Sequence, residues 1–178
     1  MVRFFILFLV LQAALFGIEL TPWAQQWFVD PWTIALAHIS TNLVTLFDPD
    51  VVATGRVIRS TANGFAVSIE AGCNGVEATI VLLAAMLAFP APWKNKLYGL
   101  VAGTLAVQGL NIVRVISLFY LGQWNRQWFE WAHLYVWQAL IMLDVLVVWL
   151  VWVRTLPRDD RRGGPPPEAG TSVVSAAA

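Results

Sequence analysis

Residues 71–78 read Ala-Gly-Cys-Asn-Gly-Val-Glu-Ala and mark the point where a polar segment gives way to a strongly apolar one. The segment holds Cys73, the only cysteine of the chain, so it cannot form an internal disulfide. A lone cysteine is often a small, inert core residue. Here glycines leave room for other groups to approach the sulfur, and Glu77 follows one helical turn later. We therefore interpret Cys73 as a candidate nucleophile at the head of a membrane helix.

The composition identifies an integral membrane protein. The 178 residues are 58% hydrophobic and only 12% charged, about half the charged fraction that is typical of soluble domains. Ten tryptophans suit the interfaces of a bilayer. The sequence contains no basic patch, phosphate-binding glycine loop or Cys/His cluster. We therefore expect no nucleic-acid partner, no metal and no cofactor.

The apolar segments predict an all-α polytopic membrane bundle of about four transmembrane helices, since about 20 residues cross a bilayer core. The predicted spans are 4–20, 75–89, 97–121 and 133–153, within a single membrane domain, 1–156. Residues 157–178 are polar and rich in glycine and proline, which predicts a disordered cytoplasmic tail. The first segment also fits a signal peptide, but residues 14–17 make a poor cleavage site, so we favour a retained helix.

Two segments between the first and second spans differ from the rest. Residues 31–47 are bounded by two Asp-Pro pairs and carry many polar residues, which predicts a helix that lies in the interface or re-enters the membrane. His38 in this helix is expected to be a packing residue. Residues 51–70 alternate apolar and polar residues around Asn63-Gly64, which predicts a small extracytoplasmic β-hairpin.

The basic residues predict the orientation, because cytoplasmic loops are enriched in lysine and arginine. Four spans with both termini inside place Arg3, Lys94, Lys96 and the arginines that follow the last span in the cytoplasm. A fifth span at 31–47 would move the two lysines outside, which the positive-inside bias disfavours.

In this topology three chemically capable side chains reach the outer leaflet. Cys73 and His133 begin their spans there, and Arg114 lies about 25 Å from the cytoplasmic end of its helix. Taken singly, the arginine could extend toward lipid headgroups and the histidine could cap its helix. Asn111 and Arg114 belong to a polar stripe that must face protein. We expect a Glu77–Arg114 pair as structural support.

These groups suit acyl transfer. A thiolate is the reactive form of cysteine, and a neighbouring histidine or arginine lowers the pKa of a thiol. Attack on a peptide carbonyl gives an oxyanion, which a guanidinium stabilises, and then a thioester. His133 could serve as base for the thiol and as acid for the leaving amine.

The motifs that carry these residues resemble the exosortase/archaeosortase family. They are Gly72-Cys73-Asn74-Gly75 at the head of a span, Asn111-Ile-Val-Arg114-Val-Ile in the next span, and His133 at the head of the last. The form Gly-Cys-Asn-Gly-Val-Glu-Ala, followed by Ala88-Phe89-Pro90, is most similar to the exosortase H branch. The resemblance covers roughly residues 65 to 150.

This resemblance implies a membrane-embedded cysteine transpeptidase or protease of the bacterial inner membrane, with its active site at the extracytoplasmic face. Its substrates would carry a C-terminal sorting signal: a short motif of the Ile-Pro-Thr-Leu-x-x-Trp-Gly type, a membrane helix and a basic cluster. By the same analogy Cys73 is the nucleophile, Arg114 the oxyanion or positioning group, and His133 the proton-transfer residue. Asn74, Glu77 and Asn111 would support them.

Two other functions remain open from the residues alone. The chain could be a non-catalytic small membrane subunit of a secretion or envelope assembly, in which these side chains pack against a partner or against lipid. It could also be an acyltransferase that uses lipid acyl donors.

Overall fold

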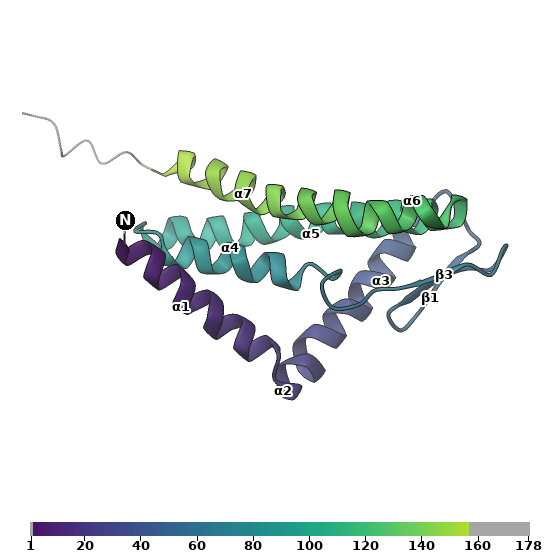
Figure 1. Cartoon of the computed structure of the whole chain (residues 1–178), viewed down its shortest axis with the longest axis horizontal. Helices are drawn as coiled ribbons and strands as arrows, with labels where there is room; N and C mark the ends of the chain where they lie inside the picture. Colours follow the sequence, from purple (N-terminus) through teal and green to yellow (C-terminus); the bar gives the residue numbers. More distant parts are fainter. Residues whose placement is uncertain (1, 157–178) are drawn as a thin grey trace, which may run out of the picture.

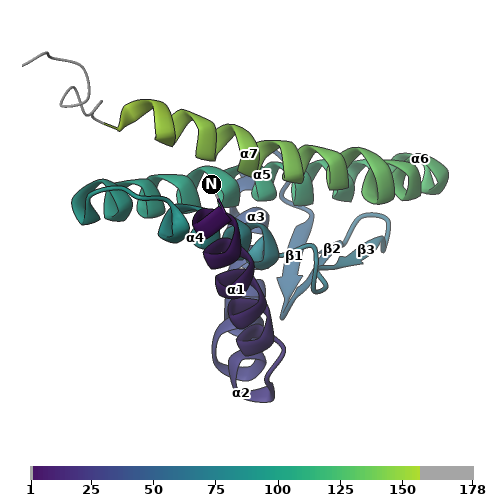
Figure 2. The ribbon, with the colours of Figure 1, turned by 60° about the vertical axis from the view of Figure 1, so that its left-hand side comes forward.

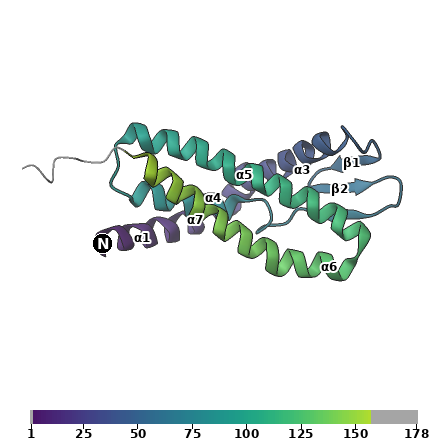
Figure 3. The same ribbon diagram turned by 90° about the horizontal axis from the view of Figure 1, so that it is seen from above.

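Helices α4, α5 and α7 lie side by side along the long axis of the molecule in the computed structural model, which describes residues 2–156 (Figures 1 and 3). Helix α1 packs on α4 and projects from the bundle toward α2 (Figure 2). The elements are α1 (Val2–Glu19), α2 (Pro22–Ala24), η1 (Gln25–Val29), α3 (Asp30–Val44), β1 (Val51–Thr54), β2 (Val57–Ser60), β3 (Ala66–Ser68), α4 (Val76–Ala88), α5 (Trp93–Trp124), α6 (Arg126–Trp131), η2 (Ala132–Val136) and α7 (Trp137–Thr155).

The helices confirm a polytopic helical membrane protein. Three are long and apolar enough to cross a bilayer: Val2–Glu19, Trp93–Trp124 and the continuous helix Arg126–Thr155 formed by α6, η2 and α7. The remaining predicted span, 75–89, corresponds to α4, an apolar helix of 13 residues. At 1.5 Å per residue it is about 20 Å long, so it covers roughly two thirds of a hydrocarbon core.

The last helix begins earlier than the sequence suggested. We predicted a start at 133, but the helix begins at Arg126, where the Asn125 side chain accepts hydrogen bonds from the N–H groups of Gln127 and Trp128. His133 therefore lies two turns inside the helix instead of at its head. The predicted tail, 157–178, lies outside the described residues.

The bundle core lies where the small residues of α5 face α4 and α7. Leu82, Met86 and Val107 are fully buried there. Gly99 admits the Trp152 indole, which would clash with a Cβ at this position. Trp152 Nε1 donates to the Asn95 carbonyl at 3.0 Å. The glycine therefore permits close packing of α5 and α7.

Helix α3 and a small sheet pack together at one end of the bundle (Figure 1). Helix α3 corresponds to the predicted helix 31–47, and its buried residues Leu36, Ala37 and Val44 pack with the sheet and α5. The sheet is a three-stranded antiparallel meander in the order β1-β2-β3. The turn at Asn63-Gly64 was predicted, but a second turn at Gly55-Arg56 divides the first predicted strand, so two strands become three. We call this end of the bundle the sheet end.

Candidate active site

The loop between β3 and α4 is held in an irregular conformation by glycines. Gly72 and Gly75 have φ angles of +82° and +74°, in the left-handed region where a Cβ is costly. The Cys73 N–H donates to the Glu70 carbonyl at 3.0 Å, and the Gly72 N–H donates to Glu77 Oε1 at 2.6 Å. These contacts fix the loop immediately before the first turn of α4.

Asn74 anchors this loop to α3. Its side chain is fully buried; Nδ2 donates to Thr33 Oγ1 at 3.0 Å, and Oδ1 accepts from the Val76 N–H at 3.0 Å. The Asn74 carbonyl accepts from Trp32 Nε1 at 3.1 Å. Asn74 therefore positions its neighbour Cys73 from the opposite side of the loop.

Helix α5 contacts the same loop through its polar stripe. Gln108 Nε2 donates to the Gly75 carbonyl at 3.1 Å and to Thr79 Oγ1 at 3.0 Å. Asn111 is fully buried, and neither its Oδ1 nor its Nδ2 has a hydrogen-bond partner within residues 2–156. Buried amides without partners are rare and call for an explanation, and this one lies one turn from Arg114.

We expect Gly75→Ala to destabilise the site. A Cβ at Gly75 would lie 2.8 Å from Gln108 Oε1 and 3.1 Å from Asn111 Nδ2, on a backbone with positive φ. The strained backbone costs about 1–2 kcal/mol, and crowding a packed site costs about 1–3 kcal/mol more. Thermal unfolding in detergent measures the loss.

Gly55→Ala is the matched control for this substitution. Gly55 also has a positive φ, +58°, but a Cβ there would meet nothing within 4 Å. It should show only the backbone cost. Equal destabilisation by both variants would mean that the contact of Gly75 with α5 is loose.

Cys73, His133 and Arg114 come together at the sheet end. Cys73 Sγ lies 3.2 Å from His133 Nε2 and 3.5 Å from Arg114 Nη2. Arg114 Nη1 donates to the Gly72 carbonyl at 3.3 Å, and the arginine is only 2% exposed. A cavity of about 40 Å³ opens beside the three side chains, walled by β3, α5 and Phe129. The guanidinium and the imidazole thus approach the sulfur from two separate helices.

The position of His133 depends on a local change of helix type. It lies in η2, a five-residue π-helical turn within an otherwise α-helical span. The His133 ring packs edge-on against Phe129, with centroids 5.6 Å apart. Such π turns occur frequently at functional sites because they shift side chains around the helix. Nothing in the hydropathy of the segment signals this turn.

The Glu77–Arg114 pair that we predicted does not form. Glu77 instead accepts from the Gly72 N–H, and Arg114 directs its two terminal nitrogens at the Gly72 carbonyl and at Cys73. The loop backbone thus lies between the two charges. A carboxylate in the first turn of a helix readily accepts hydrogen bonds from nearby backbone N–H groups. Depth in the membrane alone does not indicate this alternative partner for Glu77.

Arg114 lowers the pKa of Cys73, as expected of a neighbouring arginine, but the net shift is upward. Burial raises the pKa of the thiol above its ordinary value, while the Arg114 guanidinium lowers it and Glu77 and Glu70 add to the rise. Burial dominates because the charged thiolate loses its hydration. The rise in pKa favours the neutral thiol over the thiolate.

We expect the pH midpoint for alkylation of Cys73 by iodoacetamide to lie above that of the same thiol in the denatured chain. The raised pKa leaves less thiolate at neutral pH, so the rate should keep increasing at higher pH than for an exposed cysteine. Arg114→Gln should move the midpoint further upward, because it removes the group that lowers the pKa. A midpoint below that of the denatured chain would contradict this electrostatic account.

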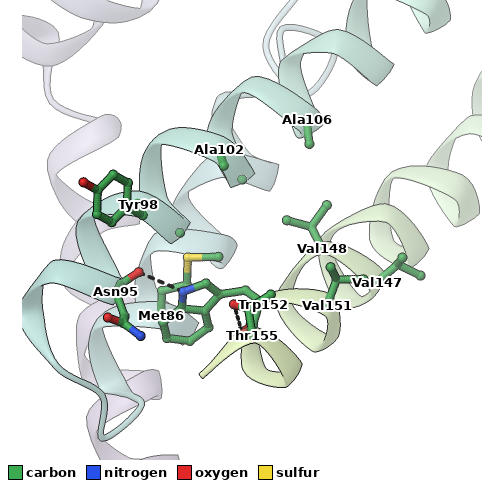
Figure 4. A pocket seen from close by; sticks show the side chains of 12 residues that line it. Met86, Asn95, Tyr98, Ala102, Ala106, Val147, Val148, Val151, Trp152 and Thr155 are labelled. Carbon is green, nitrogen blue, oxygen red and sulfur yellow. Dashed lines mark hydrogen bonds between the residues drawn. The ribbon is translucent and has the colours of Figure 1, made fainter. Parts of the chain in front are cut away.

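A larger cavity lies away from this chemistry. It has a volume of about 510 Å³ and lies between α5 and α7, with an almost wholly apolar lining that includes Ala102, Ala106 and Val151 (Figure 4). Its lining contains no cysteine, histidine or carboxylate. Within residues 2–156, no three histidine, cysteine or carboxylate side chains are grouped so that they could hold a metal ion.

Comparison with known families identifies a relationship over most of the chain. A family model described as transmembrane exosortase (Exosortase_EpsH) matches residues 2–150. Comparisons with curated proteins and with solved structures gave no match. The matched range includes every predicted site residue.

Proposed function

Because the chain belongs to the transmembrane exosortase family, we propose that it is a membrane-embedded cysteine transpeptidase that processes proteins with a C-terminal sorting signal. The observation that carries the proposal is the contact of one thiol with an imidazole at 3.2 Å and with a guanidinium at 3.5 Å. A nucleophile within hydrogen-bond reach of a base is the signature of covalent catalysis.

In the first half of the reaction the thiol is acylated. His133 Nε2 accepts the Cys73 proton as the sulfur attacks the scissile carbonyl, and the carbonyl oxygen becomes an oxyanion. Arg114, whose Nη2 contacts the sulfur, donates its N–H groups to that oxyanion. Collapse of the tetrahedral intermediate breaks the C–N bond, and His133 returns the proton to the leaving amine. The products are a thioester on Cys73 and the released C-terminal membrane helix.

In the second half an acceptor attacks the thioester. An amine gives transpeptidation and water gives hydrolysis, and His133 takes the proton of either nucleophile. The thiol is regenerated with its proton. Both outcomes use the same three side chains, so the acceptor sets the product.

The supporting residues position the loop. Asn74 ties it to α3, Glu77 holds the Gly72 N–H, and the α5 stripe that contains Asn111 packs beneath Gly75. We further propose that the sheet end faces the extracytoplasmic side of the bacterial inner membrane, with both termini cytoplasmic. Lys94 and Lys96 in the first turn of α5 then lie at the cytoplasmic side, as the positive-inside rule favours.

Co-expression with a reporter tests the proposal. The reporter carries a C-terminal signal of the Ile-Pro-Thr-Leu-x-x-Trp-Gly type, an apolar helix and an arginine cluster. Membranes that contain the enzyme should yield a product shortened by the helix, and membranes without it should not. A reporter whose signal is scrambled but whose helix and arginines are retained is the control. Equal processing of both reporters would refute recognition of the signal.

A further inference from the structure

The outer edge of β3 carries backbone groups that the fold does not use. Phe65, Val67 and Ile69 direct their backbone groups toward the β1–β2 hairpin; the Phe65 carbonyl and the Ile69 N–H bond to it at 2.9 and 3.0 Å. Because ladder bonds alternate along an antiparallel strand, the N–H and C=O groups of Ala66 and Ser68 point the other way. Within residues 2–156 these groups have no hydrogen-bond partner.

This edge borders a groove. A cavity of about 340 Å³ separates β3 from the helical wall formed by Gly122, Arg126, Phe129 and Glu130. Both side chains of β3 that point away from the core, Ala66 and Ser68, are exposed there. The groove therefore lies between the outer edge of the strand and α6.

The groove continues into the cavity at the nucleophile. Val67, Ser68 and Phe129 line both spaces. Strand β3 runs toward the loop that holds Cys73. A chain that follows the strand edge from the Ala66 end therefore arrives at the sulfur and runs parallel to β3.

We propose that the substrate segment immediately before the scissile bond binds as a fourth strand on the outer edge of β3. This inference rests on the proposed function and deepens it by assigning the recognition surface. The backbone groups of Ala66 and Ser68 bond to every second residue of the segment, and alternate substrate side chains face the wall at Gly122 and Phe129. Edge addition of this kind draws affinity from the main chain and specificity from alternate side chains.

A strand added to an edge constrains its own prolines. Only residues whose N–H groups point away from β3 can be proline, since the others must donate to the edge. In a signal of the Ile-Pro-Thr-Leu type, the proline therefore determines which residues of the segment direct their N–H groups toward β3. The N–H groups of the isoleucine and threonine beside the proline point toward the edge of β3, and the N–H group of the leucine points away from it.

The first test substitutes matched alanines on the two edges of the sheet. Ala66→Pro removes an N–H group that points outward from the edge of β3. Ala53→Pro removes the corresponding N–H group from the opposite edge strand, β1, in which the neighbouring residue Thr54 pairs with Val57. We expect Ala66→Pro to slow reporter processing by about five- to tenfold, the value of one hydrogen bond. Ala53→Pro should leave processing within twofold. Equal effects of the two variants would overturn the proposal.

A second readout separates binding from damage to the site. Alkylation of Cys73 by iodoacetamide needs no peptide, so Ala66→Pro should leave its rate unchanged. If Ala66→Pro slowed alkylation as much as processing, the proline would be acting on the thiol site, and the edge assignment would fail. Wild-type chain that did not process the reporter at all would refute the proposed function itself.

The third test leaves the protein intact. Purified wild-type chain in detergent is given synthetic peptides that contain the signal, the helix and the arginines, each N-methylated at one position. Methylation one residue before or after the proline should reduce processing at least about fivefold. Methylation two residues after the proline should be tolerated. Losses without this two-residue period would overturn strand addition.

Discussion

Cys73→Ala should abolish processing of the sorting-signal reporter. Loss of the nucleophile removes the covalent step, and comparable losses in other acyl-transfer enzymes are on the order of 10⁴-fold or more. The measurement is the ratio of processed to full-length reporter in membranes that contain equal amounts of each chain. The loss should be complete, because neither His133 nor Arg114 can form the acyl intermediate in place of the thiol.

The fold should survive this substitution. Cys73 is half-buried, and its backbone N–H bonds to the Glu70 carbonyl whatever its side chain. We therefore expect unchanged accumulation in the membrane and a similar unfolding temperature in detergent. Processing that continued in Cys73→Ala would support the non-catalytic subunit, since that function needs only the packing of the loop.

Arg114→Lys should reduce processing by about 10²- to 10³-fold, the usual effect of losing one oxyanion donor. Lysine keeps the positive charge but not the planar fork, so it cannot reach the Gly72 carbonyl and the substrate oxygen together. Arg114 is buried, and its Nη1 and Nη2 have separate acceptors. The expected loss therefore comes from geometry and not from charge. Single-turnover reporter cleavage measures it.

Arg59→Lys is the matched control. Arg59 lies on β2 and is exposed. The Arg59→Lys variant should process the reporter at the wild-type rate. If Arg114→Lys also retained full processing, the guanidinium would serve only as a charge, and the assignment of an oxyanion donor would be wrong.

The helical bundle could be predicted from the sequence because the hydropathy of each segment shows where the membrane helices lie. Apolar runs bounded by proline and lysine locate α4 and α5. The basic residues at the termini and at Lys94 and Lys96 predict a topology in which Cys73, Arg114 and His133 share one end. That reasoning needs only depth along each helix. It succeeds because a bilayer orders residues by depth, and the contact of His133 with Cys73 agrees with it.

The errors arise where the chain departs from regular geometry. The start of the last helix is set by the Asn125 cap, which lies among tryptophans that read equally well as a loop. The π turn at η2 rotates His133 without any compositional signal. The prediction of a Glu77–Arg114 pair was wrong because two residues at the same depth in the membrane can still point in different directions around their helices. The net rise in the Cys73 pKa likewise depends on burial, which sequence alone does not give.

The most direct test of the central claim is the intact mass of the enzyme after brief reaction with the sorting-signal peptide. We expect an adduct, which digestion places on the fragment that contains Cys73. Its mass should equal that of the peptide up to its cleavage point less one water, and hydroxylamine should remove it, as it does a thioester. His133→Ala should form it slowly, and His38→Ala at the wild-type rate. Cleaved peptide that appears in this assay without any adduct on Cys73, at every time sampled, would contradict the account.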